Sequence, residues 1–111
     1  LGLSSYGKPA NFPDYPWEEL SSLDFGLPQI YDAQDQYGPG FPQRCVDNWR
    51  EWFKDKPIVP TLGVNSTSAA RMRVLFDNTP LDDGACSWWS FRGAISENDK
   101  ASTFREFQVA P

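Results

Sequence analysis

The chain has 111 residues, a formal net charge of −5 and no histidine. Its composition, 40% hydrophobic and 15% aromatic, is that of one globular domain with a modest core. The acidic balance and the lack of a Lys/Arg cluster exclude nucleic acid as a partner, because binding it requires a phosphate-neutralising surface. Without histidine, the Ser-His-Asp and Cys-His catalytic arrangements and imidazole metal sites are excluded too. We expect no metal and no cofactor, so any acid-base chemistry must rest on carboxylates.

No apolar run approaches the roughly 20 residues that cross a bilayer, and the first residues lack the layout of a signal peptide. We therefore expect no membrane partner. Cys45 and Cys86 permit one disulfide, but each also lies in an apolar pattern where a buried free thiol is ordinary. The sequence leaves both states of the cysteines open.

Four short segments have the composition of strands: residues 1–7, 25–32, 56–64 and 84–91. Their spacing is close to the size of one βα unit, so the gaps between them predict helices. These helices are expected at residues 16–23, 42–55, 68–78 and 96–109.

The helix predicted at residues 42–55 has the clearest pattern. Its apolar residues recur at helical spacing on one face: Cys45, Trp49, Trp52 and Phe53. The opposite face is charged, as a solvated face should be. We therefore expect Trp49 and Trp52 to belong to the core.

Alternating strands and helices predict an α/β fold with a parallel sheet. A small doubly wound sheet and a half (β/α)8 TIM-type barrel both fit four βα units. Irregular strands that contain Pro28, Pro57 and Pro60 favour the barrel. A doubly wound phosphate-binding domain would need a glycine-rich loop after the first strand, where only Gly7 is found. We predict one half-barrel domain over residues 1–111, belonging to a longer polypeptide.

A polar cluster ends the second predicted strand, where plain turn residues would be expected. It consists of Gln29, Tyr31, Asp32, Gln34 and Asp35. Alternation along a strand places Gln29 and Tyr31 on one face. Sugars present CH faces to aromatic rings and hydroxyls to polar side chains, so this cluster suits a carbohydrate. It also lies at the carboxyl end of a strand, where sites in this architecture gather.

The segments GLSSYG, FPDYPWEEL, LPQIYD, KPIVPTLGV and GACSWWSF resemble, in order, strands five to eight of glycoside-hydrolase-like (β/α)8 barrels. Chitinase-like and lysozyme-like barrels are the most similar. The chitinase-like families end strand six in Met-x-Tyr-Asp, and here Gln29 takes the place of Met. The resemblance implies that Tyr31 and Asp32 contact the sugar. Asp32, the candidate catalytic residue, would orient the sugar or an intermediate rather than donate the proton.

The same families place a tryptophan near the end of strand eight as the floor of a sugar subsite. Trp88 or Trp89 would take that place, and only one of two neighbours on a strand faces inward. We favour Trp89 and expect the other to pack against a helix. Arg92 is predicted to bind an acidic sugar or a peptide carboxylate, with pairing to a nearby Asp as the alternative.

Structural roles remain open for two of these residues. Tyr31 could fill a layer of the barrel, and Asp32 could cap the following loop. In the chitinase-like barrels the general acid comes from strand four, which this sequence does not contain. The chain alone is therefore expected to be inactive as an enzyme.

We predict a polysaccharide-binding half barrel that hydrolyses a cell-wall glycan only when the missing N-terminal half or a second copy completes it. The alternative is a non-catalytic structural or interaction module of a larger assembly, such as a virion or a cell-surface protein. The sequence leaves the location open, and the resemblance favours an extracellular or virion-associated one.

Overall fold

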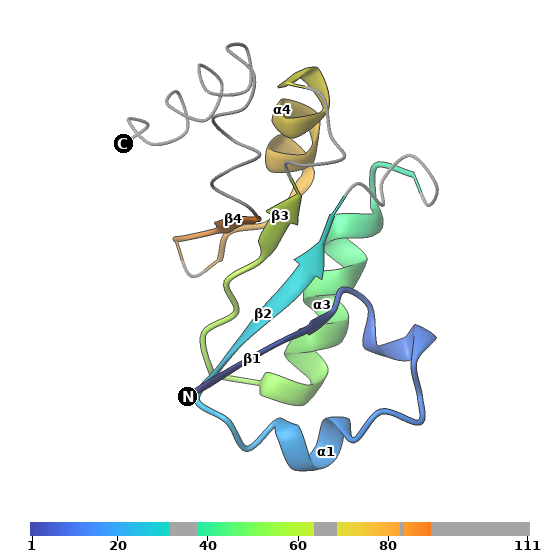
Figure 1. The fold of residues 1–111 in the computed structure, drawn as a ribbon, viewed down its shortest axis with the longest axis vertical. Helices are drawn as coiled ribbons and strands as arrows, with labels where there is room; N and C mark the ends of the chain where they lie inside the picture. Colours follow the sequence, from blue (N-terminus) through green and yellow to red (C-terminus); the bar gives the residue numbers. More distant parts are fainter. Residues whose placement is uncertain (32–37, 64–68, 83, 90–111) are drawn as a thin grey trace.

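A four-stranded, all-parallel sheet organises the chain, with its strands side by side in chain order (Figure 1). The structure is a computed structural model and describes residues 1–31, 38–63, 69–82 and 84–89. The strands are β1 (Gly2–Tyr6), β2 (Phe25–Ile30), β3 (Thr61–Gly63) and β4 (Ser87–Trp89). The helices are the 3-10 helix η1 (Pro9–Asn11), α1 (Trp17–Leu20), α3 (Phe41–Phe53) and α4 (Ala69–Asn78). The predicted α/β class with a parallel sheet is confirmed.

Burial alternates along β2, as the period of a strand requires. Gly26, Pro28 and Ile30 are buried, and the residues between them are half-buried. Ile30 pairs with Leu62 of β3, which in turn pairs with Trp88 of β4. One buried face therefore runs across three strands.

Both long described helices cover this same face. A Cβ atom on Gly26 would lie 2.6 Å from the Trp49 ring, so α3 packs directly on β2. Phe76 of α4 stacks on Trp88, with the ring centroids 6.3 Å apart. Sequential strands with right-handed connections place their helices on one side of a sheet, as seen for α3 and α4. The described part of the chain is thus not doubly wound, since that fold has helices on both faces.

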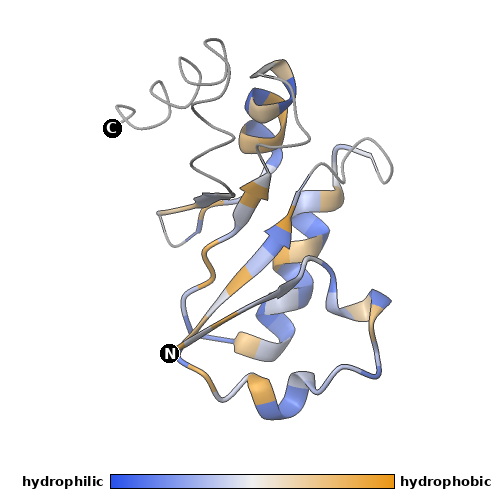
Figure 2. Cartoon of the chain, in the orientation of Figure 1, coloured by the Kyte–Doolittle hydropathy of each residue, from blue (hydrophilic) through white to orange (hydrophobic). Residues whose placement is uncertain are grey.

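The helix α3 supplies more of the described core than any other element. Phe41, Cys45, Val46, Trp49 and Phe53 are buried along it, and Figure 2 shows hydrophobic and hydrophilic bands alternating down the helix. The core includes Trp49, as predicted.

The prediction that Trp52 is a core residue is wrong, because 37% of its surface is exposed. The least exposed core residues of α3 are Cys45, Trp49 and Phe53, and Trp52 lies at the margin of the face that they form. An indole at such a position is too large for the neighbouring elements to cover completely.

Several elements are shorter than predicted. Only Thr61–Gly63 of the third predicted strand pairs regularly, because Pro57 and Pro60 lack an amide hydrogen for the ladder. The segment before it still follows β2: Gly26 donates its amide hydrogen to the Pro57 carbonyl at 3.0 Å.

The helix α1 has four residues instead of the expected eight, and the helix predicted at 96–109 lies outside the described residues. None of the described helices has the length and apolarity that crossing a bilayer requires.

The two cysteines are free thiols. Burial raises the pKa of Cys45 to about 12 and the pKa of Cys86 to about 11. Both groups therefore carry their proton at neutral pH and are poor nucleophiles.

Alkaline pH is expected to destabilise the fold through Cys45. Its raised pKa keeps the proton on the folded protein, whereas the unfolded thiol loses it near pH 8.5. The contribution of Cys45 to stability is full below that pH and falls by about 1.4 kcal/mol per pH unit as the pH rises toward the folded pKa. Urea unfolding between pH 7 and 11 measures this slope. A Cys45→Ala variant should show a shallower decline, and equal slopes in the two proteins would contradict the prediction.

Candidate functional site

Polar side chains gather around the carboxyl end of β2, on the sheet face opposite α3 and α4. We call Ser4, Gln29, Tyr31 and Thr61 the strand-end cluster. Gln29 donates a hydrogen bond from Nε2 to Ser4 Oγ at 3.2 Å. Register pairs Gln29 with Thr61, so these two residues share a face.

Tyr31 follows β2 directly and rests against β3. A Cβ atom on Gly63 would lie 3.0 Å from Tyr31 Cβ, so the tyrosine approaches the glycine closely. Gly63 shares its face with Thr61, two residues before it, which places Tyr31 on the same side as Gln29. Burial raises the pKa of Tyr31, so at neutral pH its phenol remains protonated and both donates and accepts hydrogen bonds.

Sequence analysis missed two members of the cluster, Ser4 and Thr61, of which Thr61 is the more buried. It is 7% exposed, and its hydroxyl has no hydrogen-bond partner among the described residues. Leaving a buried hydroxyl unsatisfied costs about 1 to 3 kcal/mol, and because this oxygen is enclosed by the protein it is not presented to a ligand at the surface. Its relation to Gln29 depends on the register of β2 and β3, which no local sequence signal reveals.

The remaining predicted site residues are not placed by the structure. Asp32 and Arg92 lie outside the described residues, as do Gln34 and Asp35. The backbone of Trp89 pairs with Gly63, but its side chain is outside the description. Trp88 packs on Phe76, so it is the member of the tryptophan pair that contacts a helix. Of the predicted site, the structure brings Gln29 and Tyr31 together.

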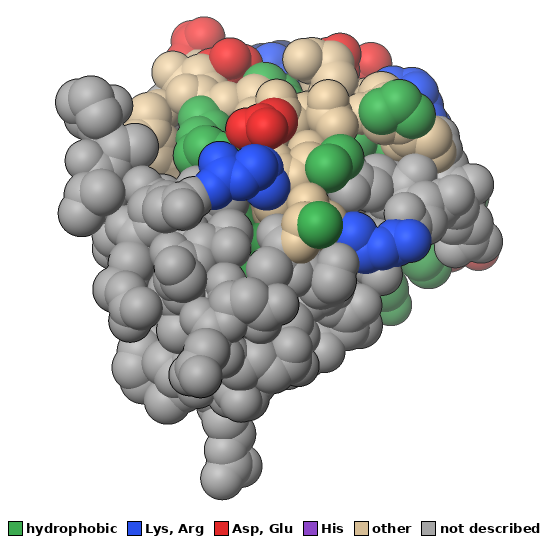
Figure 3. Space-filling view, turned by 90° about the horizontal axis from the view of Figure 1, so that it is seen from above, with side chains coloured by type: hydrophobic (Ala, Val, Ile, Leu, Met, Phe, Trp, Pro, Cys, Tyr) green, Lys and Arg blue, Asp and Glu red, His purple; other side chains and the backbone are tan. Residues whose placement is uncertain are grey.

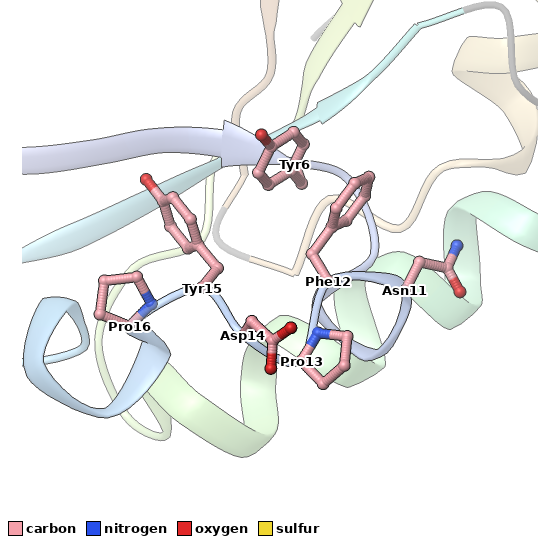
Figure 4. A pocket seen from close by; sticks show the side chains of 7 residues that line it. All are labelled: Tyr6, Asn11, Phe12, Pro13, Asp14, Tyr15 and Pro16. Atoms are coloured by element: carbon pink, nitrogen blue, oxygen red, sulfur yellow. The ribbon is translucent and has the colours of Figure 1, made fainter.

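A second feature, the aromatic hollow, opens beside the end of β1 (Figure 4). It has a volume of about 430 Å³ and is lined by Tyr6, Asn11, Phe12, Pro13, Asp14, Tyr15 and Pro16. Sequence analysis included this loop only in the segment FPDYPWEEL and assigned its residues no function. The signal that could have found it is the density of aromatic residues in a loop, where burial does not account for them.

Aromatic rings form one wall of the hollow, with Tyr6 lying between Tyr15 and Phe12 (Figure 4). Tyr6 and Phe12 stack with their centroids 3.8 Å apart and their planes 13° from parallel. Tyr15 meets Tyr6 edge-on at 5.4 Å. Tyr6 and Phe12 are each 42% exposed, so the stacked pair is open to solvent.

The hollow and the strand-end cluster adjoin each other. Tyr6 is the last residue of β1 and the register partner of Gln29. Seen from the end toward which β2 and β3 point, acidic, basic and hydrophobic side chains are interspersed over the described surface (Figure 3). No single kind of side chain dominates this surface in the described part.

Among the described residues, no group of three His, Cys, Asp or Glu side chains is placed to hold a metal ion. Comparisons of the chain with protein families, curated proteins and solved structures found no match.

Proposed function

We propose that this chain binds a polysaccharide through the strand-end cluster, as half of a glycoside-hydrolase-like barrel. The observation that carries the proposal is the placement of Gln29 and Tyr31 on one face of the sheet. An amide and a phenol at neighbouring positions offer both donors and acceptors to sugar hydroxyls, and the ring of Tyr31 offers a surface for CH groups. On this proposal, Trp89 and Arg92 remain the sugar contacts that the sequence predicts.

The half-barrel part of the proposal is supported by the arrangement of strands and helices. The strands follow chain order, and α3 and α4 lie on one face, as the units of a (β/α)8 barrel do. The opposite face would then belong to the barrel interior, completed by an N-terminal half or by a second copy of the chain. Hydrolysis requires a pair of carboxylates, so Asp32 would act only in the completed barrel.

Titration with soluble cell-wall glycans tests the binding. We expect the Gln29→Ala, Tyr31→Ala double variant to bind at least about tenfold more weakly, because it removes two polar contacts and one stacking surface. Val74→Ala, which truncates a side chain of α4 that is 47% exposed, is the matched control and should bind like the parent. Calorimetry measures the affinities, and circular dichroism verifies that each variant is folded.

The solution mass, measured by light scattering on the same samples, tests completion by a second copy. A dimer that binds glycan supports a barrel completed by symmetry. A folded chain that binds none of the glycans would contradict the proposal and favour the structural or interaction module.

A further inference from the structure

We infer that the aromatic hollow is a second glycan subsite, which takes the ring of a neutral sugar and continues the strand-end cluster. The inference rests on the proposed function, because it assigns the hollow to the same polysaccharide. Tyr6 connects the two surfaces, since its ring lines the hollow and its backbone pairs with Gln29.

The stacked pair of Tyr6 and Phe12 provides a flat aromatic platform. Their nearly parallel rings cover each other on one side, which leaves the outer surface of the pair to a ligand. The CH face of a pyranose ring matches such a platform in size and polarity. A cage for an ammonium ion would need several ring faces turned toward one point, and stacked rings do not provide that.

Polar groups beside the platform determine the charge of the ligand. Asn11 and Asp14 line the hollow and offer an amide and a carboxylate to sugar hydroxyls. None of the seven lining residues is Lys or Arg, so nothing in this lining would neutralise an acidic sugar. The whole chain carries a net charge of −5, which also disfavours an anion. A neutral sugar is therefore the ligand class that fits.

The platform is held in place by hydrogen bonds to the core. The indole of Trp49 donates to the Tyr6 carbonyl, and the indole of Trp17 donates to the Phe12 carbonyl, both at 2.9 Å. The amide of Ala10 donates to Asn48 Oδ1 of α3 at 2.7 Å. A site already fixed in its binding geometry loses less entropy when a ligand docks.

Two substitutions of Phe12 test the subsite. Phe12→Ala removes the outer ring of the platform, and Phe12→Leu keeps apolar bulk without a flat ring. Both leave the backbone carbonyl that binds Trp17. Trp52→Ala, an exposed aromatic residue of α3, is the matched control. The probes are chitohexaose and cellohexaose as neutral glycans, a galacturonic acid hexamer as an acidic one, and tetramethylammonium as a cation.

We expect both Phe12 variants to bind the preferred neutral hexamer about tenfold more weakly, while Trp52→Ala is unchanged. If the parent chain and all three variants bound a neutral hexamer with equal affinity, the subsite would be overturned and the proposed function would stand. If no glycan binds the parent, both proposals fail. Preference for the acidic hexamer, or loss of tetramethylammonium binding in Phe12→Ala, would overturn the assignment to a neutral sugar.

Discussion

Replacing Trp49 by alanine is expected to lower the free energy of unfolding by about 3 to 5 kcal/mol, a large share of what a domain of this size has. Trp49 is fully buried and stacks on Phe53, with the centroids 5.2 Å apart. It also packs edge-on against Trp17 and against the backbone of Gly26. The substitution would leave a cavity between α3 and β2 and would deprive the Tyr6 carbonyl of its indole donor. Urea unfolding followed by circular dichroism measures the loss.

Trp52→Ala is the control for this measurement, because it removes the same side chain from the same helix. Trp52 lies at the margin of the buried face and is partly exposed, so we expect a cost below about 1 kcal/mol. Similar losses in the two variants would contradict the packing described for α3. A Trp49→Phe variant, which keeps an aromatic ring but loses the indole donor and part of the ring volume, should have a stability between those of the parent and Trp49→Ala.

The helix α3 illustrates how much of the fold the sequence could predict. Its helical spacing and the proline in its first turn located it to within two residues at each end, because both signals are local. The sequence misjudged Trp52 because four apolar positions do not determine the centre of a buried face. That centre depends on where the sheet lies, which is a tertiary property.

The strands were less predictable for a related reason. The third predicted strand contains two prolines, and only its last part pairs regularly with β2. The order of the strands followed from the βα repeat, since sequential units tend to be neighbours. The lengths of the strands depend on hydrogen bonds to neighbours that are distant in the chain, so composition alone overestimated them.

The candidate site was predictable where it depends on alternation within one strand. Gln29 and Tyr31 share a face because they are two residues apart in an extended segment. Thr61 and Tyr6 join them only through the register between strands, which is a long-range property. The aromatic hollow depends on the path of a loop that is held by Asn48 and Trp17, so its shape could not be derived from the loop sequence alone.

Replacing Gly7 by alanine is expected to lower the free energy of unfolding by about 1 to 3 kcal/mol and, on the proposed function, to weaken glycan binding at the hollow. A Cβ atom on Gly7 would lie 2.5 Å from the backbone oxygen of Gln29, a contact that no side-chain rotation can relieve. The chain would have to move away from β2 at the point where it enters the loop of the hollow, which would disturb Tyr6. Urea unfolding and titration with the preferred neutral hexamer measure the two effects.

The matched control is Gly40→Ala, which adds the same methyl group at the start of α3. There the new Cβ atom would meet only the end of the flexible Arg44 side chain, at 3.0 Å, and the backbone has an ordinary helical conformation with φ −80°. We expect stability to change by less than about 1 kcal/mol, because the less flexible unfolded chain offsets the contact with Arg44, and we expect binding to stay the same. If Gly7→Ala changed stability and binding as little as this control, the result would contradict the close contact described between the end of β1 and β2. Because Tyr6 joins the hollow to the strand-end cluster, the contact at Gly7 is also the structural link through which the two proposed sugar subsites keep a fixed relative position.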